Sequence, residues 1–111
     1  MVFPDGSEKL LDEILGPGFS LLGFECDPAD EVPATVMARF EEIGAQTAAV
    51  SGARNASKWP RDPGGKLDEL FRGEAGTMAL IRPDRFIVSA FTRDSAAEGL
   101  AASEKALSLN G

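Results

Sequence analysis

The chain has 111 residues, a formal net charge of −7 and 43% hydrophobic residues, which fits one globular domain. It contains no histidine and a single cysteine, which excludes Ser-His-Asp and Cys-His catalysis, an internal disulfide and a thiolate zinc cluster. The negative charge opposes phosphate backbones and anionic membrane surfaces, so we expect no nucleic-acid or membrane partner. No apolar run approaches the roughly 20 residues of a membrane helix, and no signal-peptide pattern begins the chain, which favours a cytoplasmic location.

The N-terminal part predicts a short helix and then a buried strand. Ser7 is expected to cap the helix through its side-chain oxygen. The helix is indicated by apolar residues that recur at spacings of three and four, namely Leu10, Leu11, Ile14 and Leu15. Gly16-Pro17-Gly18 should end it. The nearly continuous apolar run 19–25 is typical of a buried strand, and a polar turn is expected at 26–31.

A second helix and a second strand follow. Pro33 suits the first turn of a helix that Gly44 can end, and the apolar face of that helix comprises Val36, Met37, Phe40 and Ile43. Residues 46–51 form another strand candidate. Residues 52–65 are predicted to be the longest loop, since they hold two Pro and three Gly, and a short helix marked by Leu67, Leu70 and Phe71 comes after it.

The C-terminal part contains the best hairpin signal. Strand-like runs at 77–81 and 86–92 are joined by Arg82-Pro83-Asp84-Arg85, whose Pro and Asp suit a type I turn. Ser95 and Glu98 have the spacing of a capping box, so the last helix is expected to run from there to about Leu107. One side of this helix is predicted to carry Ala96, Leu100, Ser103 and Leu107.

These elements predict one α/β domain over residues 1–111. A β-α-β unit implies a parallel strand pair with a right-handed crossover. The hairpin adds antiparallel strands to that pair. The expected architecture is a four-stranded mixed sheet with helices on both faces, and this is the thioredoxin-like arrangement.

Two sequence motifs suggest a family. Residues 10–12 (LLD) followed by 16–22 (GPGFSLL), and later 81–86 (IRPDRF), resemble the C-terminal domain of FAD-dependent aromatic-ring hydroxylases. These are the phenol hydroxylase and hydroxyphenylpropionate hydroxylase group of flavoprotein monooxygenases. The resemblance extends from about Asp5 to Phe91. Arg85 departs from the family pattern, which usually has Gly there, and this argues against a turn that needs a positive φ at residue 85.

The resemblance implies a redox-inactive, thioredoxin-like domain with a structural or subunit-interaction role and no turnover by itself. No cofactor is expected in this chain, because no G-x-G-x-x-G follows a strand and opens a helix. FAD and NAD(P)H are implied for a parent or partner enzyme. The expected partners are the flavin and substrate domains of a monooxygenase, or a second copy of the chain in a dimer.

Cys26 is the candidate for a catalytic residue. It follows the first predicted strand, where thioredoxins place their reactive pair, but the resolving position three residues on is Ala29. The favoured interpretation is an inert cysteine at a strand end. The alternative is a single-cysteine redox protein that uses a thiolate at Cys26.

Trp59 and Arg61 are the candidates for binding a partner. Trp and Arg are enriched at binding hot spots, and both lie in the least core-like segment of the chain. A small aromatic-ligand-binding module built on this loop is a further alternative. The competing interpretation is that Trp59 folds back over the edge of the core. No residue pattern predicts a metal site.

Overall fold

A computed structural model of the chain describes residues 1–53 and 59–110. The helices are α1 (Leu11–Leu15), α2 (Pro28–Glu31), α3 (Ala34–Ile43), α4 (Lys66–Leu70) and α5 (Ala96–Asn110), with a 3₁₀ turn η1 (Arg93–Ser95) before α5. The strands are β1 (Ser20–Phe24), β2 (Gln46–Val50), β3 (Met78–Ile81) and β4 (Ile87–Phe91). Every strand expected from the sequence is therefore present, within one or two residues at each end.

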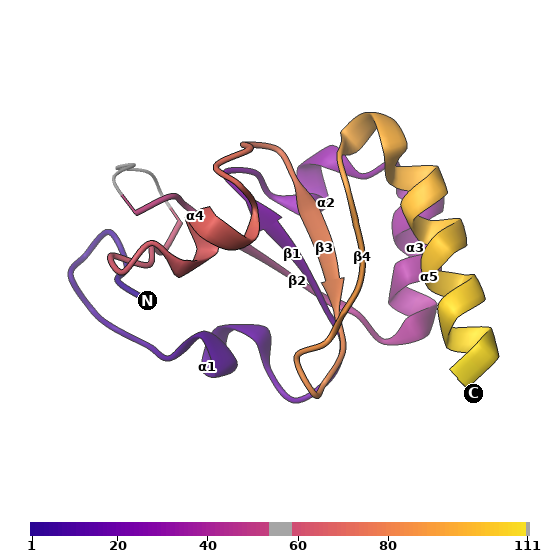
Figure 1. The fold of residues 1–111 in the computed structure, drawn as a ribbon, viewed down its shortest axis with the longest axis horizontal. Helices are drawn as coiled ribbons and strands as arrows, with labels where there is room; N and C mark the ends of the chain where they lie inside the picture. Colours follow the sequence, from indigo (N-terminus) through magenta and orange to yellow (C-terminus); the bar gives the residue numbers. More distant parts are fainter. Residues whose placement is uncertain (54–58, 111) are drawn as a thin grey trace.

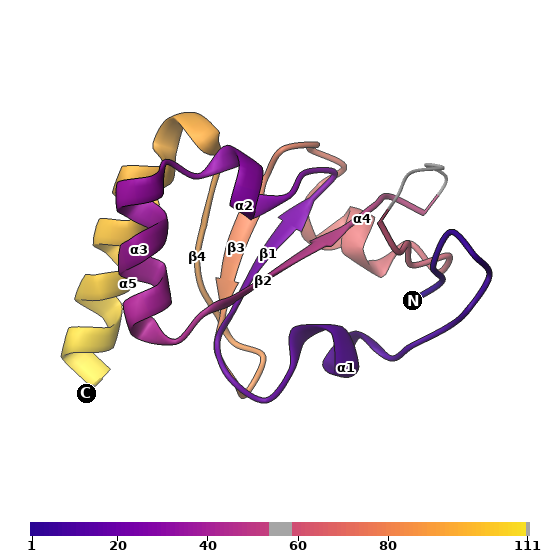
Figure 2. The same ribbon diagram turned by 180° about the vertical axis from the view of Figure 1, so that it is seen from behind.

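The four strands form one mixed sheet in the order β2-β1-β3-β4. β1 and β2 are parallel, whereas β3 is antiparallel to both β1 and β4. Helices α3 and α5 lie on one face of the sheet, and α1 and α4 lie on the other (Figures 1 and 2). The structure confirms the predicted four-stranded α/β sheet with helices on both faces.

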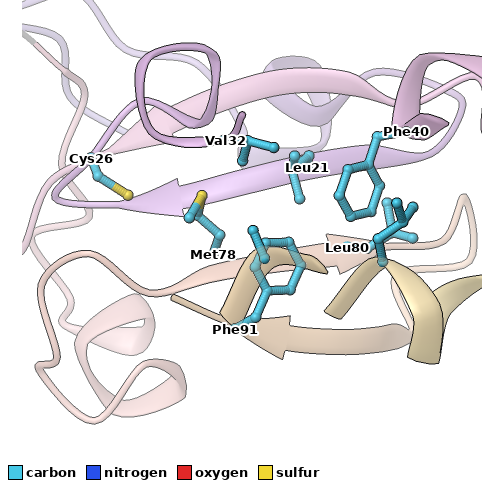
Figure 3. Close-up of a cluster of buried hydrophobic side chains, with 9 residues drawn as sticks. Leu21, Cys26, Val32, Phe40, Met78, Leu80 and Phe91 are labelled. Carbon is cyan, nitrogen blue, oxygen red and sulfur yellow. The ribbon is translucent and has the colours of Figure 1, made fainter. Parts of the chain in front are cut away.

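Two hydrophobic clusters, one on each face, hold the layers together. On the α3/α5 face, Leu21 packs among Met78 and Leu80, and the Phe40 ring stacks on Phe91 with 5.6 Å between ring centroids (Figure 3). The opposite cluster comprises Leu15, Leu22, Phe24, Val50, Leu67, Phe71, Ala79 and Ile81. β1 alternates between these clusters and is buried on both sides, which explains its nearly continuous apolar sequence.

The structure differs from the predicted helix caps. Ser7 does not cap α1; its amide and hydroxyl both donate to Asp5 Oδ1, at 2.9 and 2.6 Å, which closes a local Asp turn instead. The capping box near the last helix lies three residues earlier than expected, because Thr92 and Ser95 bond to each other across η1. The chain must turn sharply as soon as β4 ends, so the cap falls at the strand end rather than at Ser95–Glu98.

The hairpin turn also corrects the expectation for Arg85. The Arg85 amide donates to the Arg82 carbonyl at 2.8 Å, as in a type I turn, but Arg85 itself has φ +72°. A left-handed residue after a type I turn matches the right-handed twist of a hairpin, and glycine usually occupies that position. The Arg85 side chain has a use there, since Nε contacts Asp12 Oδ1 at 2.9 Å and Nη2 donates to the Gly16 carbonyl at 3.0 Å. Arg85 thus fastens the end of α1 to the hairpin.

Substitutions at Arg85 should separate backbone strain from this contact. We expect Arg85→Ala to be less stable than Arg85→Gly by about 1 kcal/mol, because both lose the side-chain contacts but only alanine keeps a strained left-handed backbone. Urea unfolding of the two variants measures the difference. Equal stability of the two would show that residue 85 leaves the left-handed region without cost.

Candidate functional site

Cys26 lies in the turn between β1 and α2 and is buried, with 5% of its surface exposed. Its Sγ is 4.0 Å from the Thr77 carbonyl oxygen, just before β3. Met78 and Val32 belong to the same cluster, and Cys26 lies at one end of that cluster (Figure 3). The structure therefore places the thiol inside the apolar layer between the sheet and the α3/α5 helices.

Gly23 allows this turn to fold back over β1. A Cβ on Gly23 would lie 2.8 Å from Pro28 Cδ and 3.0 Å from Cys26 Sγ, and closer still to the Cys26 carbonyl oxygen. Glu25, between them, has φ +58°, so the chain reverses direction at once after the strand. Gly23 is not among the candidate residues predicted from the sequence. A glycine inside an apolar strand is the signal that marks such a close backbone approach.

The surroundings of Cys26 favour the thiol over the thiolate. Burial, together with the negative charges of Glu31 and Asp27, raises the pKa of Cys26 from an ordinary value of 9.0 to about 11. Reactive cysteines need the opposite, namely a partly exposed and electropositive site. Ala29, at the position of a resolving cysteine, is exposed on α2. The geometry favours the inert interpretation of Cys26.

Cys26 should be alkylated slowly in the folded protein. Each pKa unit changes the thiolate fraction tenfold, so at pH 8 the shift alone lowers the alkylation rate by about 100-fold relative to the urea-unfolded chain. The raised pKa also stabilises the fold fully below the unfolded value, and this contribution is lost as the pH rises through about 11. Iodoacetamide labelling followed by mass spectrometry measures the ratio. Equal rates in folded and unfolded protein would revive the thiol redox alternative.

Trp59 and Arg61 lie in a backbone segment beside the C-terminal end of β2. The Arg61 amide and carbonyl pair with Val2, each at 2.8 Å, and the Arg61 guanidinium donates to the Ala53 carbonyl at 3.0 Å. Trp59 is partly buried, and its carbonyl accepts a hydrogen bond from Ser51 Oγ at 3.4 Å. Residues 54–58 of the predicted loop lie outside the described residues. The Arg61 side chain thus bridges the two ends of its loop through Ala53. Partner binding by Arg61 and by Trp59 stays a prediction.

A cavity of about 670 Å³ opens at the carboxyl ends of β1 and β2. Glu25 and Asp68 face each other across Gly52 on its wall. The Gly52 amide donates to Glu25 Oε1, and the Ala53 amide donates to Asp68 Oδ2 at 2.9 Å. Neither carboxylate is among the candidates predicted from the sequence. They hold the backbone that leaves β2.

Metal ligands and membrane spans are both absent from the part of the chain that the structure describes. Within it, no group of three or more His, Cys, Asp or Glu side chains could hold a metal ion. No described helix is long and apolar enough to cross a membrane.

Comparison with known proteins identifies the family. Residues 2–106 match the family model described as HcaD C-terminal domain. The chain belongs to this family. Among curated relatives of this HcaD C-terminal domain, a 3-(3-hydroxy-phenyl)propionate/3-hydroxycinnamic acid hydroxylase 2 of Burkholderia vietnamiensis is 28% identical over an alignment of 97 positions that covers 77% of this chain and 18% of the relative. The corresponding hydroxylase of Klebsiella pneumoniae is 30% identical over an alignment of 93 positions that covers 76% of this chain and 17% of the relative.

Solved structures share the fold of this HcaD C-terminal domain. The flavin-dependent monooxygenase PieE matches 81% of this chain with 15% of its own, at a TM-score of 0.59 and 22% identity. Peroxidoxin BcpB from Mycobacterium tuberculosis matches 94% of this chain and 90% of its own, at a TM-score of 0.55 and 20% identity. These matches confirm the thioredoxin-like fold, and the family match confirms the resemblance to C-terminal domains of FAD-dependent hydroxylases. The chain spans less than a fifth of the length of the curated relatives it matches.

Proposed function

We propose that this chain is a redox-inactive accessory domain of an FAD-dependent aromatic-ring monooxygenase, with a structural or subunit-interaction role and no turnover by itself. The observation that carries the proposal is the family match over residues 2–106, combined with relatives that are hydroxylases more than five times as long as the matched segment. The expected partners are the flavin and substrate domains of such an enzyme.

The turn after β1 does not fit the pyrophosphate of FAD. The turn after β1 reads Glu25-Cys26-Asp27-Pro28, without the glycines that let a backbone approach a pyrophosphate. Glu25 and Asp27 place two carboxylates there, which would repel its negative charge. FAD and NAD(P)H would therefore be held by the other domains, and the buried Cys26 leaves this chain no evident thiol chemistry to add.

The proposal predicts that the purified chain is colourless. With added FAD, NAD(P)H and a phenolic acid it should not oxidise the nicotinamide above the rate without protein. The Burkholderia vietnamiensis hydroxylase, assayed beside it, is the positive control. A flavin absorption band that persists in the chain after desalting, or turnover of NAD(P)H, would contradict the proposal.

The structural role has its own test. A hybrid in which this chain replaces the matching segment of that hydroxylase should keep FAD, whereas the hydroxylase without that segment should lose FAD or aggregate. A hybrid that behaves like the truncated enzyme would show that the chain does not serve as this domain.

A cytoplasmic location and a dimer both stay predictions. The location follows from the single unpaired cysteine, which suits a reducing compartment. Sedimentation of the pure chain tests the dimer.

A further inference from the structure

β4 is an edge strand with a bulge at Val88, because Leu80 pairs with Ser89 whereas Ile81 pairs with Ile87, but it lacks two other common forms of protection. It pairs with β3 on one side and ends the sheet on the other. Residues 86–92 contain no charge and no proline, the features by which exposed strand edges commonly avoid pairing with other chains. The charged residues Arg85 and Arg93 come only beyond this stretch. An edge of this kind is expected to be covered in the working assembly.

An apolar groove adjoins this edge on the α4 face of the sheet. It has a volume of about 300 Å³, and its lining combines the apolar Leu70, Phe71, Ala79, Ile87 and Ala90 with Thr77 and the charged Arg72 and Glu74. Leu70 is 48% exposed although it is a large hydrophobic residue, and Ala90 is exposed as well. Thr77 Oγ1 is buried without a hydrogen-bond partner among the described residues. The groove thus offers mainly apolar surface, with the unsatisfied Thr77 hydroxyl buried beneath it.

The opposite face of the sheet offers no comparable surface among the described residues. There α3 and α5 cover the sheet, and Phe40, Phe91 and Leu100 are buried beneath them. Arg39 of α3 and Glu104 of α5 form an ion pair across the two helices. The outward positions of these helices include Ala38 and Ala101, which lie on a charged and solvated surface. The β4 edge thus combines an uncharged strand edge with a largely apolar groove, whereas β2, the other edge strand, is uncharged as well.

The net charge of this chain and the length of its relatives indicate what covers the β4 edge and the groove. A second copy would bring together two chains of net charge −7, which repel each other. In the relatives, by contrast, more than four fifths of the polypeptide lies outside the matched segment, so a large protein body stands next to this domain. A body of that size can cover both the edge and the groove.

We propose that the β4 edge and the groove beside it, from Leu70 to Ala90, form the surface that docks on the flavin-binding body of the monooxygenase. This inference rests on the proposed function and adds to it the face of contact. The α3/α5 face is then left to solvent.

Hydrogen exchange on the hybrid enzyme tests the surface. Relative to the isolated chain, we expect exchange in peptides covering 67–79 and 86–92 to slow by at least about tenfold, with 34–43 and 97–107 unchanged. Protection over α3 and α5 in a hybrid that keeps FAD would overturn the docking surface and leave the proposed function intact. A hybrid without new protection anywhere, or without FAD, would contradict the proposed function.

Charged substitutions give a second readout. Ala90→Arg and Leu70→Glu should lower the melting temperature of the hybrid but leave that of the isolated chain unchanged, because both side chains are exposed in the chain alone. Ala38→Arg, exposed on α3, is the matched control and should change neither. Equal effects of Ala90→Arg and Ala38→Arg on the hybrid would overturn the inference.

A measurement on the isolated chain keeps the surface testable if the hybrid fails to fold. A dye that fluoresces on apolar surfaces should bind the chain, and both groove variants should reduce its fluorescence while Ala38→Arg does not. Identical dye binding by all variants would overturn the inference that this groove is an exposed apolar surface. A sedimentation mass twice that of the chain, abolished by Ala90→Arg, would assign it to a second copy instead.

Discussion

Replacing Gly23 with alanine should lower the free energy of unfolding by about 3 kcal/mol or more, at the upper end of the cost of overpacking a core. The new methyl group would meet Pro28 Cδ at 2.8 Å and the Cys26 carbonyl still closer, and a fixed backbone turn cannot yield as a flexible side chain can. The turn that buries Cys26 would have to lift away from β1. Thermal unfolding should show a midpoint lower by more than about 10 °C.

Gly18→Ala is the matched control for Gly23. Gly18 precedes β1 in the same segment, and a Cβ there would have only the Gly44 carbonyl nearby, at 4.0 Å. We expect its stability to stay within about 0.5 kcal/mol of the parent, as for most surface substitutions. The Gly23 variant should also alkylate faster at Cys26, because the lifted turn exposes the thiol. Unchanged stability and unchanged labelling together would disprove the close approach.

The second large effect is expected at Gly99, where α5 crosses β4. A Cβ at Gly99 would lie 2.9 Å from the Cβ of Phe91 and nearer still to its ring, so Gly99→Ala should push α5 away from the sheet. We expect a loss of about 2 kcal/mol in urea unfolding. The sign of this change in unfolding free energy is informative, since alanine in a helix is otherwise favoured over glycine by about 1 kcal/mol.

Two variants control for this effect. Ala101→Gly, at an exposed position of α5, should cost only the propensity difference of about 1 kcal/mol. In a Phe91→Ala background the penalty of Gly99→Ala should shrink, because the ring atoms that the methyl group meets are gone. A penalty of the same size in the parent and in the Phe91→Ala background would place the strain elsewhere.

The expected helices and strands rest on local patterns, and these were largely sufficient for the architecture. The apolar run of β1 and the hairpin with its Arg82-Pro83 turn identified strands that the structure contains. The motifs around residues 16–22 and 81–86 pointed to the family that the comparisons show. Such signals can be read from the sequence because burial of a strand and the geometry of a turn impose residue types at short range.

The caps and the hairpin conformation could not be predicted in the same way. Ser7 and Ser95 both have the right side chain for a helix cap, but where a helix begins depends on the direction in which the chain arrives. At Arg85, twist between β3 and β4 requires a positive φ, and a contact with Asp12, 73 residues away in the chain, favours arginine there. Neither constraint is visible in neighbouring residues.

By itself, the sequence determined the order of the strands, the thioredoxin-like class and the family, because periodicity, turn chemistry and motif spacing are local properties of the chain. It did not predict α2, since residues 26–31 were expected to form a polar turn. Only the tertiary structure shows how deeply Cys26 is buried and which strands end the sheet. The pKa of a thiol depends on how deeply the fold buries it and on which charges surround it. Likewise, β4 reads like any other strand, and its exposed edge exists only because the sheet ends there.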